Sequence, residues 1–251
     1  MEYSFYIYLI LTTVCLFVGF LGGFLGIALG AVRLPIIILL GIEPIIAVST
    51  NLLAVIFGST AGLIPAIKQN RVPVKSSLVI SIPSMVAAFL GGYFAFQIPE
   101  FFLLVIMIFC LVLSGLVMTF YKITEYDNNK TQKHFLKEAF VGLIISYLGG
   151  TVGLALGVLR VPAFVYFLKM NIRTAGGINL LVSILVGISA YAGHSFSGSL
   201  DYLLIICIVF PTVIGMYFGS RFVKIANDNH LRKALGITLL ILSIVLVIRE
   251  L

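Results

Sequence analysis

The chain contains the stretch Gly26-Ile-Ala-Leu-Gly30-Ala-Val-Arg33-Leu-Pro35, and 127 residues later it repeats the pattern as Gly153-Leu-Ala-Leu-Gly157-Val-Leu-Arg160-Val-Pro162. Each copy places one arginine inside a stretch that is otherwise almost wholly apolar. A charge at membrane depth costs several kcal/mol and is rarely retained without a function. Two such charges at matching places in two halves of one chain predict a single paired site.

The composition is that of a membrane protein. The 251 residues are 61% hydrophobic and 10% charged, with a mean hydropathy of +1.19. Soluble domains carry about 25% charged residues, so we expect an all-α polytopic membrane protein. The first segment lacks a basic start, which favours a retained span over a cleaved signal peptide. The net charge of +7 comes from basic residues scattered over short loops, which is typical of charges that orient a membrane protein and not of a nucleic-acid surface.

The similarity between the halves extends beyond the arginine motif. Three further pairs of identical residues follow at an offset of 128: Asn51 and Asn179, Pro83 and Pro211, Gly91 and Gly219. We therefore expect a first membrane repeat over 1–121, a cytoplasmic linker over 122–137 and a second membrane repeat over 138–251. Repeats of this kind are common in transporters, in parallel or inverted orientation.

Each half divides into five hydrophobic segments. They run over 4–21, 24–40, 44–67, 76–97 and 101–121, and over 138–149, 153–168, 172–193, 202–222 and 231–248. The first two segments of each half are short and interrupted by glycine. They fit either one broken helix or a helical hairpin that enters the membrane and returns to its starting side.

The basic residues discriminate between these two topologies. Apart from the two motif arginines, the hairpin topology places every Lys and Arg except Arg249 on the linker side of the membrane. A single crossing would divide them almost evenly, so the positive-inside rule favours the hairpin. Each half then comprises a Gly/Pro-broken helical hairpin followed by three transmembrane helices. The halves are predicted to be inverted-topology repeats in the cell (cytoplasmic) membrane, with both termini outside.

The two arginines are expected near the bilayer midplane. Arg33 lies eight residues before the turn at Gly41, and Arg160 lies nine before Lys169. At 1.5 Å per residue they are about 12 and 13 Å deep, from opposite faces, in a core of roughly 30 Å. Asn51 and Asn179 reach a similar depth in the following helices.

The backbone around each arginine is typical of a binding site. Pro35 and Pro162 suit the first turn of a half-helix, whose N–H groups and positive dipole end would then face the midplane. Arginine adds a planar donor fork suited to sulfonate, phosphate or carboxylate. The predicted substrate-binding residues are Arg33, Arg160, Asn51, Asn179, Ser49, Thr50, Gly30 and Gly157.

Structural roles are the alternatives for these residues. The arginines could brace unwound carbonyl groups or extend to an interface, and the asparagines could form interhelical hydrogen bonds. Ser and Thr in spans usually bond their own helix. The sequence shows no Walker motif, metal-ligand cluster or Ser/His/Asp arrangement. We therefore expect no enzyme activity, no cofactor and no metal.

Three stretches carry a resemblance to a known family. Leu39-Leu-Gly-Ile-Glu-Pro44, Ala47-Val-Ser-Thr50-Asn-Leu-Leu and Arg173-Thr-Ala-Gly-Gly-Ile-Asn179-Leu-Leu, with the Gly-rich segments before the prolines, resemble the TauE/SafE-type sulfite exporter family over nearly the whole chain. The resemblance implies a prokaryotic cytoplasmic-membrane transporter of small sulfur-containing anions such as sulfite, sulfoacetate or other organosulfonates. The motif arginines depart from the family's usual run of glycines and aliphatic residues, so the anion itself stays open.

The leading hypothesis is a transporter, acting as an exporter, whose partners are a small anionic substrate and the lipid bilayer, with no nucleic acid. No Asp or Glu is expected at membrane depth, so export driven by the membrane potential fits best, at about 2.3 kcal/mol per charge per 100 mV. An anion channel, or a non-transporting scaffold with bracing arginines, are the alternatives. The sequence leaves open whether the chain forms a homo-oligomer.

Overall fold

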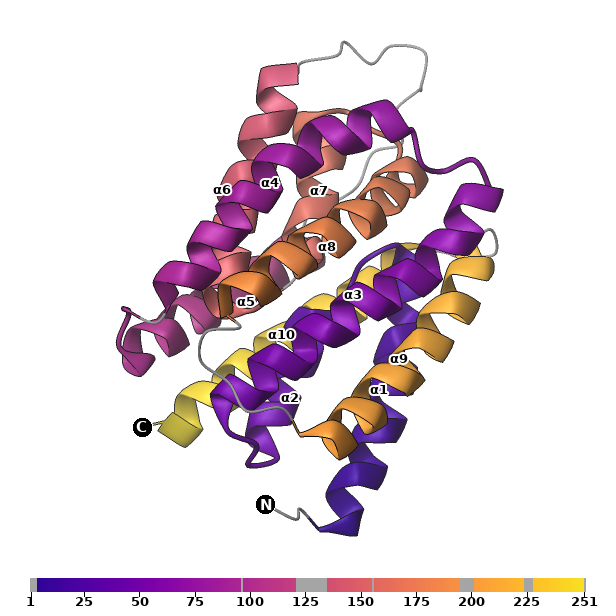
Figure 1. Cartoon of the computed structure of the whole chain (residues 1–251). Coiled ribbons are helices and arrows are strands. Elements are labelled where there is room, and N and C mark those ends of the chain that lie inside the picture. Colours follow the sequence, from indigo (N-terminus) through magenta and orange to yellow (C-terminus); the bar gives the residue numbers. More distant parts are fainter. Residues whose placement is uncertain are drawn as a thin grey trace.

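The computed structural model describes residues 4–95, 97–120, 135–154, 156–194, 201–223 and 228–250. Across these ranges the chain forms helices and turns, with no strand (Figure 1). The helices are α1 (Phe5–Leu25), α2 (Gly30–Leu39), α3 (Pro44–Lys68), α4 (Val74–Ala95), α5 (Glu100–Phe120), α6 (Phe135–Val152), α7 (Gly157–Phe167), α8 (Ile172–His194), α9 (Tyr202–Arg221) and α10 (Asp228–Glu250).

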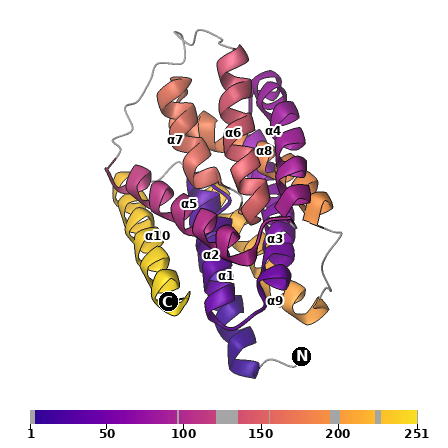
Figure 2. The same ribbon diagram turned by 90° about the vertical axis from the view of Figure 1, so that its left-hand side faces the viewer.

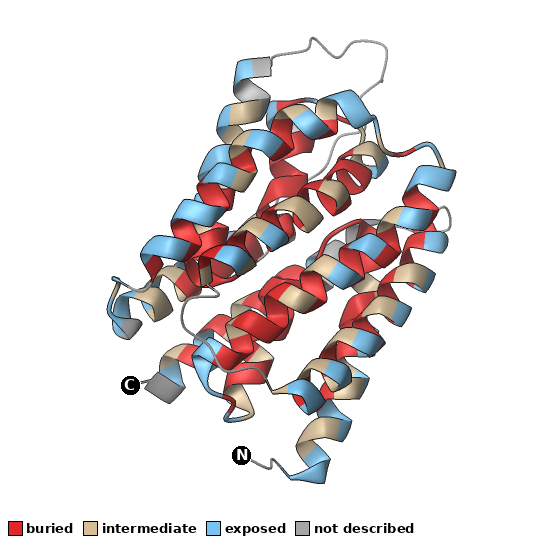
Figure 3. Cartoon of the chain, in the orientation of Figure 1, coloured by how far each residue is buried: buried red, intermediate tan, exposed pale blue. Residues whose placement is uncertain are grey.

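The expected all-α multi-pass architecture is confirmed. Six helices are long and apolar enough to cross a membrane, namely α1, α3, α4, α5, α8 and α9. Large apolar side chains such as Phe5 and Phe120 are exposed on the outer faces of the bundle (Figure 3), where lipid tails are a suitable solvent. The predicted linker over 122–137 falls mostly on residues outside the described ranges, and α6 already begins at Phe135.

Two short helices distinguish this bundle from a simple set of spans. α2 has 10 residues and α7 has 11, so each is about 15 Å long and reaches half way through a 30 Å hydrocarbon core. Each follows a long helix and a sharp reversal at a glycine, Gly26 or Gly153, and both glycines have φ of 68°. This left-handed conformation suits glycine, which has no Cβ to clash.

The two reversals share the same hydrogen bonds. Ile27 donates its N–H to the Gly22 carbonyl (2.8 Å), and Leu154 donates to the Gly149 carbonyl (2.9 Å). Each reversal glycine also donates its own N–H to a carbonyl closer in the sequence. The two bonds together form the Schellman motif that ends an α-helix. The repeated sequence thus produces a repeated hairpin, α1–α2 and α6–α7.

The prolines occupy a different place from the one predicted. α2 begins at Gly30 and α7 at Gly157, so Pro35 and Pro162 lie in the second turn and not at the helix start. Helical geometry resumes at Gly30, four residues after the reversal at Gly26, and Arg33 already donates its N–H to the Leu29 carbonyl (3.2 Å). Each arginine therefore lies in the first turn of its half-helix, ahead of the proline.

The two halves interleave. α1 begins at the end of the molecule where both chain termini lie, and α6 begins at the opposite end (Figure 1). α1 packs on α9, and its counterpart α6 packs on α4; α3 packs on α8 and α9, and α8 packs on α4. α5 and α10 lie side by side on one flank, against the half-helices (Figure 2). Their orientation relative to a bilayer stays a prediction.

Glycines allow the long helices to approach closely. A Cβ added at Gly19 of α1 would lie 2.8 Å from the Thr212 carbonyl oxygen of α9, and one at Gly219 would overlap the Phe20 carbonyl. Small residues at such interfaces let helix backbones pack together where lipid removes the hydrophobic driving force.

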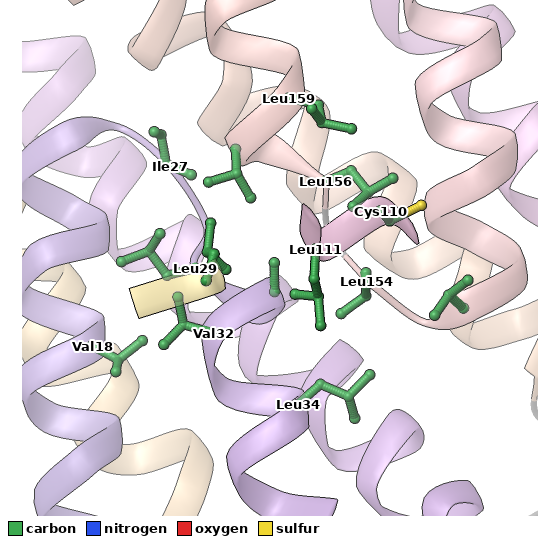
Figure 4. Close-up of a cluster of buried hydrophobic side chains, with 14 of the residues drawn as sticks. Val18, Ile27, Leu29, Val32, Leu34, Cys110, Leu111, Leu154, Leu156 and Leu159 are labelled. Carbon is green, nitrogen blue, oxygen red and sulfur yellow. The ribbon is translucent and has the colours of Figure 1, made fainter. Parts of the chain in front are cut away.

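The centre of the bundle is apolar. Ile27 and Leu29 of the first reversal and Leu154 and Leu156 of the second gather around Leu111 of α5 (Figure 4). These side chains belong to one contiguous buried cluster. The half-helices therefore start around a hydrophobic centre, and their polar side chains must find partners to either side of it.

The glycine contacts give a matched test of packing. Gly219→Ala should lower the free energy of unfolding by about 1–3 kcal/mol because its methyl group meets main-chain atoms. Gly62→Ala is the control: it is also helical, but its Cβ would sit 3.5 Å from its nearest neighbours, so its stability should be unchanged or slightly higher. Thermal melting of the two purified variants in detergent measures this. Equal melting temperatures would contradict the close α1–α9 approach.

Candidate functional site

Both motif arginines are buried inside the bundle. Arg33 is 2% exposed and Arg160 is 0% exposed, the latter being the largest fully buried side chain among the residues described. Each lies in the first turn of its half-helix. Neither guanidinium group therefore extends to the protein surface or to an interface.

Arg33 is fully engaged by neighbouring helices. It donates from Nε to Oδ1 of Asn51 (2.9 Å) and from Nη2 to the Asn51 main-chain oxygen (3.4 Å). Nη1 donates to Oγ1 of Thr212 (3.0 Å). The guanidinium group thereby ties α2 to α3 and to α9 of the other half.

Arg160 is engaged at only one nitrogen. Nη1 donates to Oδ1 of Asn179 (3.1 Å) and to Oγ of Ser183 (3.3 Å), both on α8. Nε and Nη2 are buried and have no hydrogen-bond partner in the described part of the chain. An unsatisfied buried donor costs about 1–3 kcal/mol, and more when it is charged. The same residue type in the same motif thus has two different environments.

The two asparagines connect the halves. Asn51 donates from Nδ2 to the Gly153 carbonyl (3.1 Å), and Asn179 donates from Nδ2 to the Gly26 carbonyl (3.0 Å). Each amide therefore accepts from the arginine of its own half and donates to the glycine reversal of the other. These crossed bonds are the interhelical hydrogen bonds that the sequence left as an alternative to substrate contact.

The remaining predicted residues divide into two groups. Gly30 and Gly157 lie against the asparagine amides: a Cβ at Gly157 would be 2.7 Å from Nδ2 of Asn179. Thr50 donates to the carbonyl of Ile46 in its own helix (2.8 Å), and Ser49 lines a separate pocket. In each half the structure therefore brings one glycine, one asparagine and one arginine together, whereas the Thr50 hydroxyl bonds its own helix and Ser49 lines another pocket.

Thr212 is the partner that the sequence analysis missed. Its hydroxyl accepts from Arg33 and donates to the Ile208 carbonyl (2.7 Å). It follows Pro211, just as Ser84 follows Pro83 at the offset of 128. The signal in the sequence for this role was that a hydroxyl residue directly follows the proline in both halves.

Arg33, Thr212 and Ser59 also line a cavity of about 10 Å³, which has room for about one water.

The site holds positive charge without a counter-charge. The buried side chains that the structure describes include Arg33, Arg71 and Arg160 but no Asp or Glu. By sequence no acidic residue occurs over 44–99 or over 139–200. Neutral hydrogen-bond partners offset only part of the free-energy cost of removing a buried charge from water. A bound anion would supply the opposite charge that these residues lack.

The two ends of the bundle differ. At the end where α3 meets α4, Arg71 donates from Nη2 to Oγ of Ser220 (2.9 Å) and to its carbonyl (3.1 Å). Burial, and secondarily the charge of Arg173, lowers the pKa of Arg71 to about 10, so it stays charged at neutral pH. The opposite end has a pocket of about 210 Å³ with an aliphatic lining that also includes Ser49 and His194. Arg71 and Ser220 thus link two loop ends at one end of the bundle, and the pocket lies at the other.

The crossed asparagine bonds give a direct stability prediction. Asn51→Leu leaves both the Gly153 carbonyl and Nε of Arg33 unsatisfied and should cost at least about 2 kcal/mol. Thr50→Val is the matched control at the next residue, because its hydroxyl bonds only its own helix. Thermal melting would show a clear loss for the first and little change for the second. An unaltered melting temperature in Asn51→Leu would argue against the crossed bonds.

Comparisons with known proteins identify the family of the chain. The family described as sulfite exporter TauE/SafE matches residues 11–246. Bacillus subtilis (strain 168) has two similar proteins, named "Probable membrane transporter protein YdhB" and "Probable membrane transporter protein YunE". The first is 23% identical over 92% of this chain and 96% of its own length, and the second is 24% identical over 96% and 95%.

A third relative comes from another bacterium. "Probable membrane transporter protein ORF9" of Sinorhizobium sp is 23% identical over 88% of this chain and 83% of its own length. No solved structure matches the chain significantly. The family match covers nearly the whole chain, and the helices have the length and apolar character of membrane spans. The chain therefore belongs to the TauE/SafE sulfite exporter family and is a multi-pass membrane protein of a transporter family.

Proposed function

We propose that the protein exports small sulfur-containing anions, such as sulfite, sulfoacetate or other organosulfonates, across the cell membrane. The observation that carries this proposal is the pair of buried guanidinium groups at the half-helix starts, with no buried carboxylate among the residues that the structure describes. A charge in a low-dielectric interior needs a partner of opposite sign. A small oxyanion that binds beside a motif arginine at the start of its half-helix supplies it.

The half-helices add to the attraction for an anion. Leu29 and Leu156 occupy the N-cap positions of α2 and α7, and neither start has a side-chain cap. The first N–H groups of a helix and its positive dipole end favour negative charge. Broken helices that point their N-termini at a substrate carboxylate are known in other transporters. Here each start carries an arginine in its first turn.

The class of anion is supported by the family. The family description names sulfite, and sulfite and sulfonates each present several oxygens to a planar donor fork. Arginine binds such oxygens through two parallel N–H groups. The relatives' names give transport without a substrate, so the family description together with the arginine chemistry is what supports a sulfur anion as the substrate.

The direction of transport follows from charge. The positive-inside rule places the 122–137 segment in the cytoplasm and both termini outside, which makes the two halves inverted repeats. An anion that leaves a cell with a negative interior gains about 2.3 kcal/mol per charge per 100 mV. The absence of acidic residues from the sequence of the central spans leaves no carboxylate for proton coupling.

A carrier suits the geometry better than an open pore. The starts of the two half-helices surround a leucine-rich cluster (Figure 4), and the pocket of about 210 Å³ lies at the end of the bundle opposite to Arg71 and Ser220. This arrangement supports access from one side at a time. Recordings that show unitary currents in planar bilayers would instead favour the channel alternative.

The proposal predicts transport by the purified protein. Liposomes that contain the full chain should transport radiolabelled sulfite or sulfoacetate. Transport should be faster when a potassium gradient with valinomycin makes the compartment on the protein's cytoplasmic side negative. Arg33→Ala and Arg160→Ala should each reduce transport to the rate of protein-free liposomes, because each removes one of the two buried charges at the half-helix starts.

Ser114→Ala is the control for these variants. Ser114 lies on α5 and donates only to the Cys110 carbonyl of its own helix (2.6 Å), so transport should match the unaltered protein. Undiminished transport in both arginine variants would contradict the assigned site. Absence of transport by the unaltered protein for every sulfur anion would contradict the assigned substrate.

A further inference from the structure

The two arginines use different edges of the guanidinium group. In arginine the Nε–H and one N–H of Nη2 point in the same direction, and together they form the edge that binds two oxygens of one anion. In Arg33 this edge is filled by Asn51, whose Oδ1 accepts from Nε (2.9 Å) and whose main-chain oxygen accepts from Nη2 (3.4 Å). The protein itself thus supplies the pair of oxygens that an anion would offer.

The same edge of Arg160 is empty. Asn179 accepts at Nη1 instead (3.1 Å), together with Ser183 (3.3 Å). Nε and Nη2 of Arg160 are buried without a partner in the described ranges, and the residue is 0% exposed. The unoccupied atoms are therefore the two that form a bidentate donor edge.

This empty edge belongs to the start of α7. Arg160 donates to Oδ1 of Asn179, and the amide of Asn179 lies against Gly157, the first residue of α7. α7 has 11 residues, and Leu156 at its N-cap makes no side-chain cap. A buried guanidinium edge and an uncapped helix start thus occur together, and both attract an oxyanion.

A hydroxyl group in the same half is also unsatisfied. Ser84 of α4 corresponds to Thr212 at the offset of 128, and Thr212 accepts from Nη1 of Arg33 (3.0 Å). Oγ of Ser84 is buried and has no partner in the described part of the chain, whereas Thr212 is bonded twice. The Ser84 hydroxyl faces Gly142 of α6, and α4 and α7 both pack on α8.

We propose that Arg160 binds the transported anion through its Nε and Nη2 edge, with the Ser84 hydroxyl as a further donor, while Arg33 is a structural brace. This inference rests on the proposed function and separates the roles of its two arginines. The ligand chemistry is an oxyanion with two oxygens on one atom, which sulfite, sulfonate and carboxylate share. A single-atom anion such as chloride has no second oxygen, so it cannot form the two parallel bonds that an oxyanion forms with this edge.

Melting temperatures with and without anion separate a ligand residue from a brace. The full chain in detergent should melt at a higher temperature with sulfite or methanesulfonate than with chloride at equal ionic strength, because a ligand that binds only the folded state stabilises it. Arg160→Gln should bind sulfite at least tenfold more weakly and melt no lower than the unaltered protein without anion. Arg33→Gln should melt lower without anion, because it loses bonds to α3 and α9.

The corresponding hydroxyl residues are a matched pair of variants. Ser84→Ala should reduce the sulfite-induced rise in melting temperature and leave the anion-free value unchanged, because its hydroxyl has no protein partner to lose. Thr212→Val should lower the anion-free value and keep the sulfite-induced rise. The opposite pattern in this pair would overturn the division of roles.

The outcomes distinguish this inference from the proposed function. If the unaltered protein responds to sulfite and Arg160→Gln responds equally, the assignment of Arg160 is overturned while export of sulfur anions stands. If Arg160→Gln melts as low as Arg33→Gln without anion, Arg160 is a second brace and the inference fails. If the unaltered protein neither transports nor responds to any sulfur anion, the proposed function itself fails.

Discussion

The burial of two guanidinium groups without a carboxylate is the constraint on which the rest of this structure depends. Each arginine lies in the first turn of a half-helix, and the half-helix exists because a glycine with φ of 68° reverses the chain. Neutral oxygens of asparagine, serine and threonine side chains and one carbonyl then have to hold the charges. These neutral partners stabilise the positive charges only in part. The opposite charge has to come from a bound anion.

The crossed asparagine bonds explain how the halves can act together. Asn51 links Arg33 to the reversal at Gly153, and Asn179 links Arg160 to the reversal at Gly26. Each guanidinium group is therefore connected, through one asparagine amide, to the hairpin of the other half. Such reciprocal contacts are the kind of physical network through which binding at one half can bias the conformation of the other.

Much of the fold was predictable because the bilayer imposes it. Hydropathy and helix length predicted the spans, and the offset between Asn51 and Asn179 predicted that they occupy corresponding places. The sequence did not place the half-helix starts ahead of Pro35, because the hydrogen bonds at a reversal decide where a helix resumes.

The arginine partners were harder to predict. Arg33 and Thr212 are 179 residues apart and meet only through the packing of α1, α2 and α9. Asn51 and Asn179 are the same residue type in the same place, yet one fills the donor edge of its arginine and the other leaves it open. That difference depends on side-chain geometry, which residue patterns do not encode.

The most direct test of the account is a crystal structure of the full chain soaked with selenite, a heavier analogue of sulfite whose selenium scatters anomalously. The account predicts an anomalous peak within hydrogen-bond distance of both Nε and Nη2 of Arg160, with Asn51 still bonded to Arg33. A peak that replaces Asn51 at Arg33, or an Arg160 edge filled by protein oxygens with selenite absent, would contradict it.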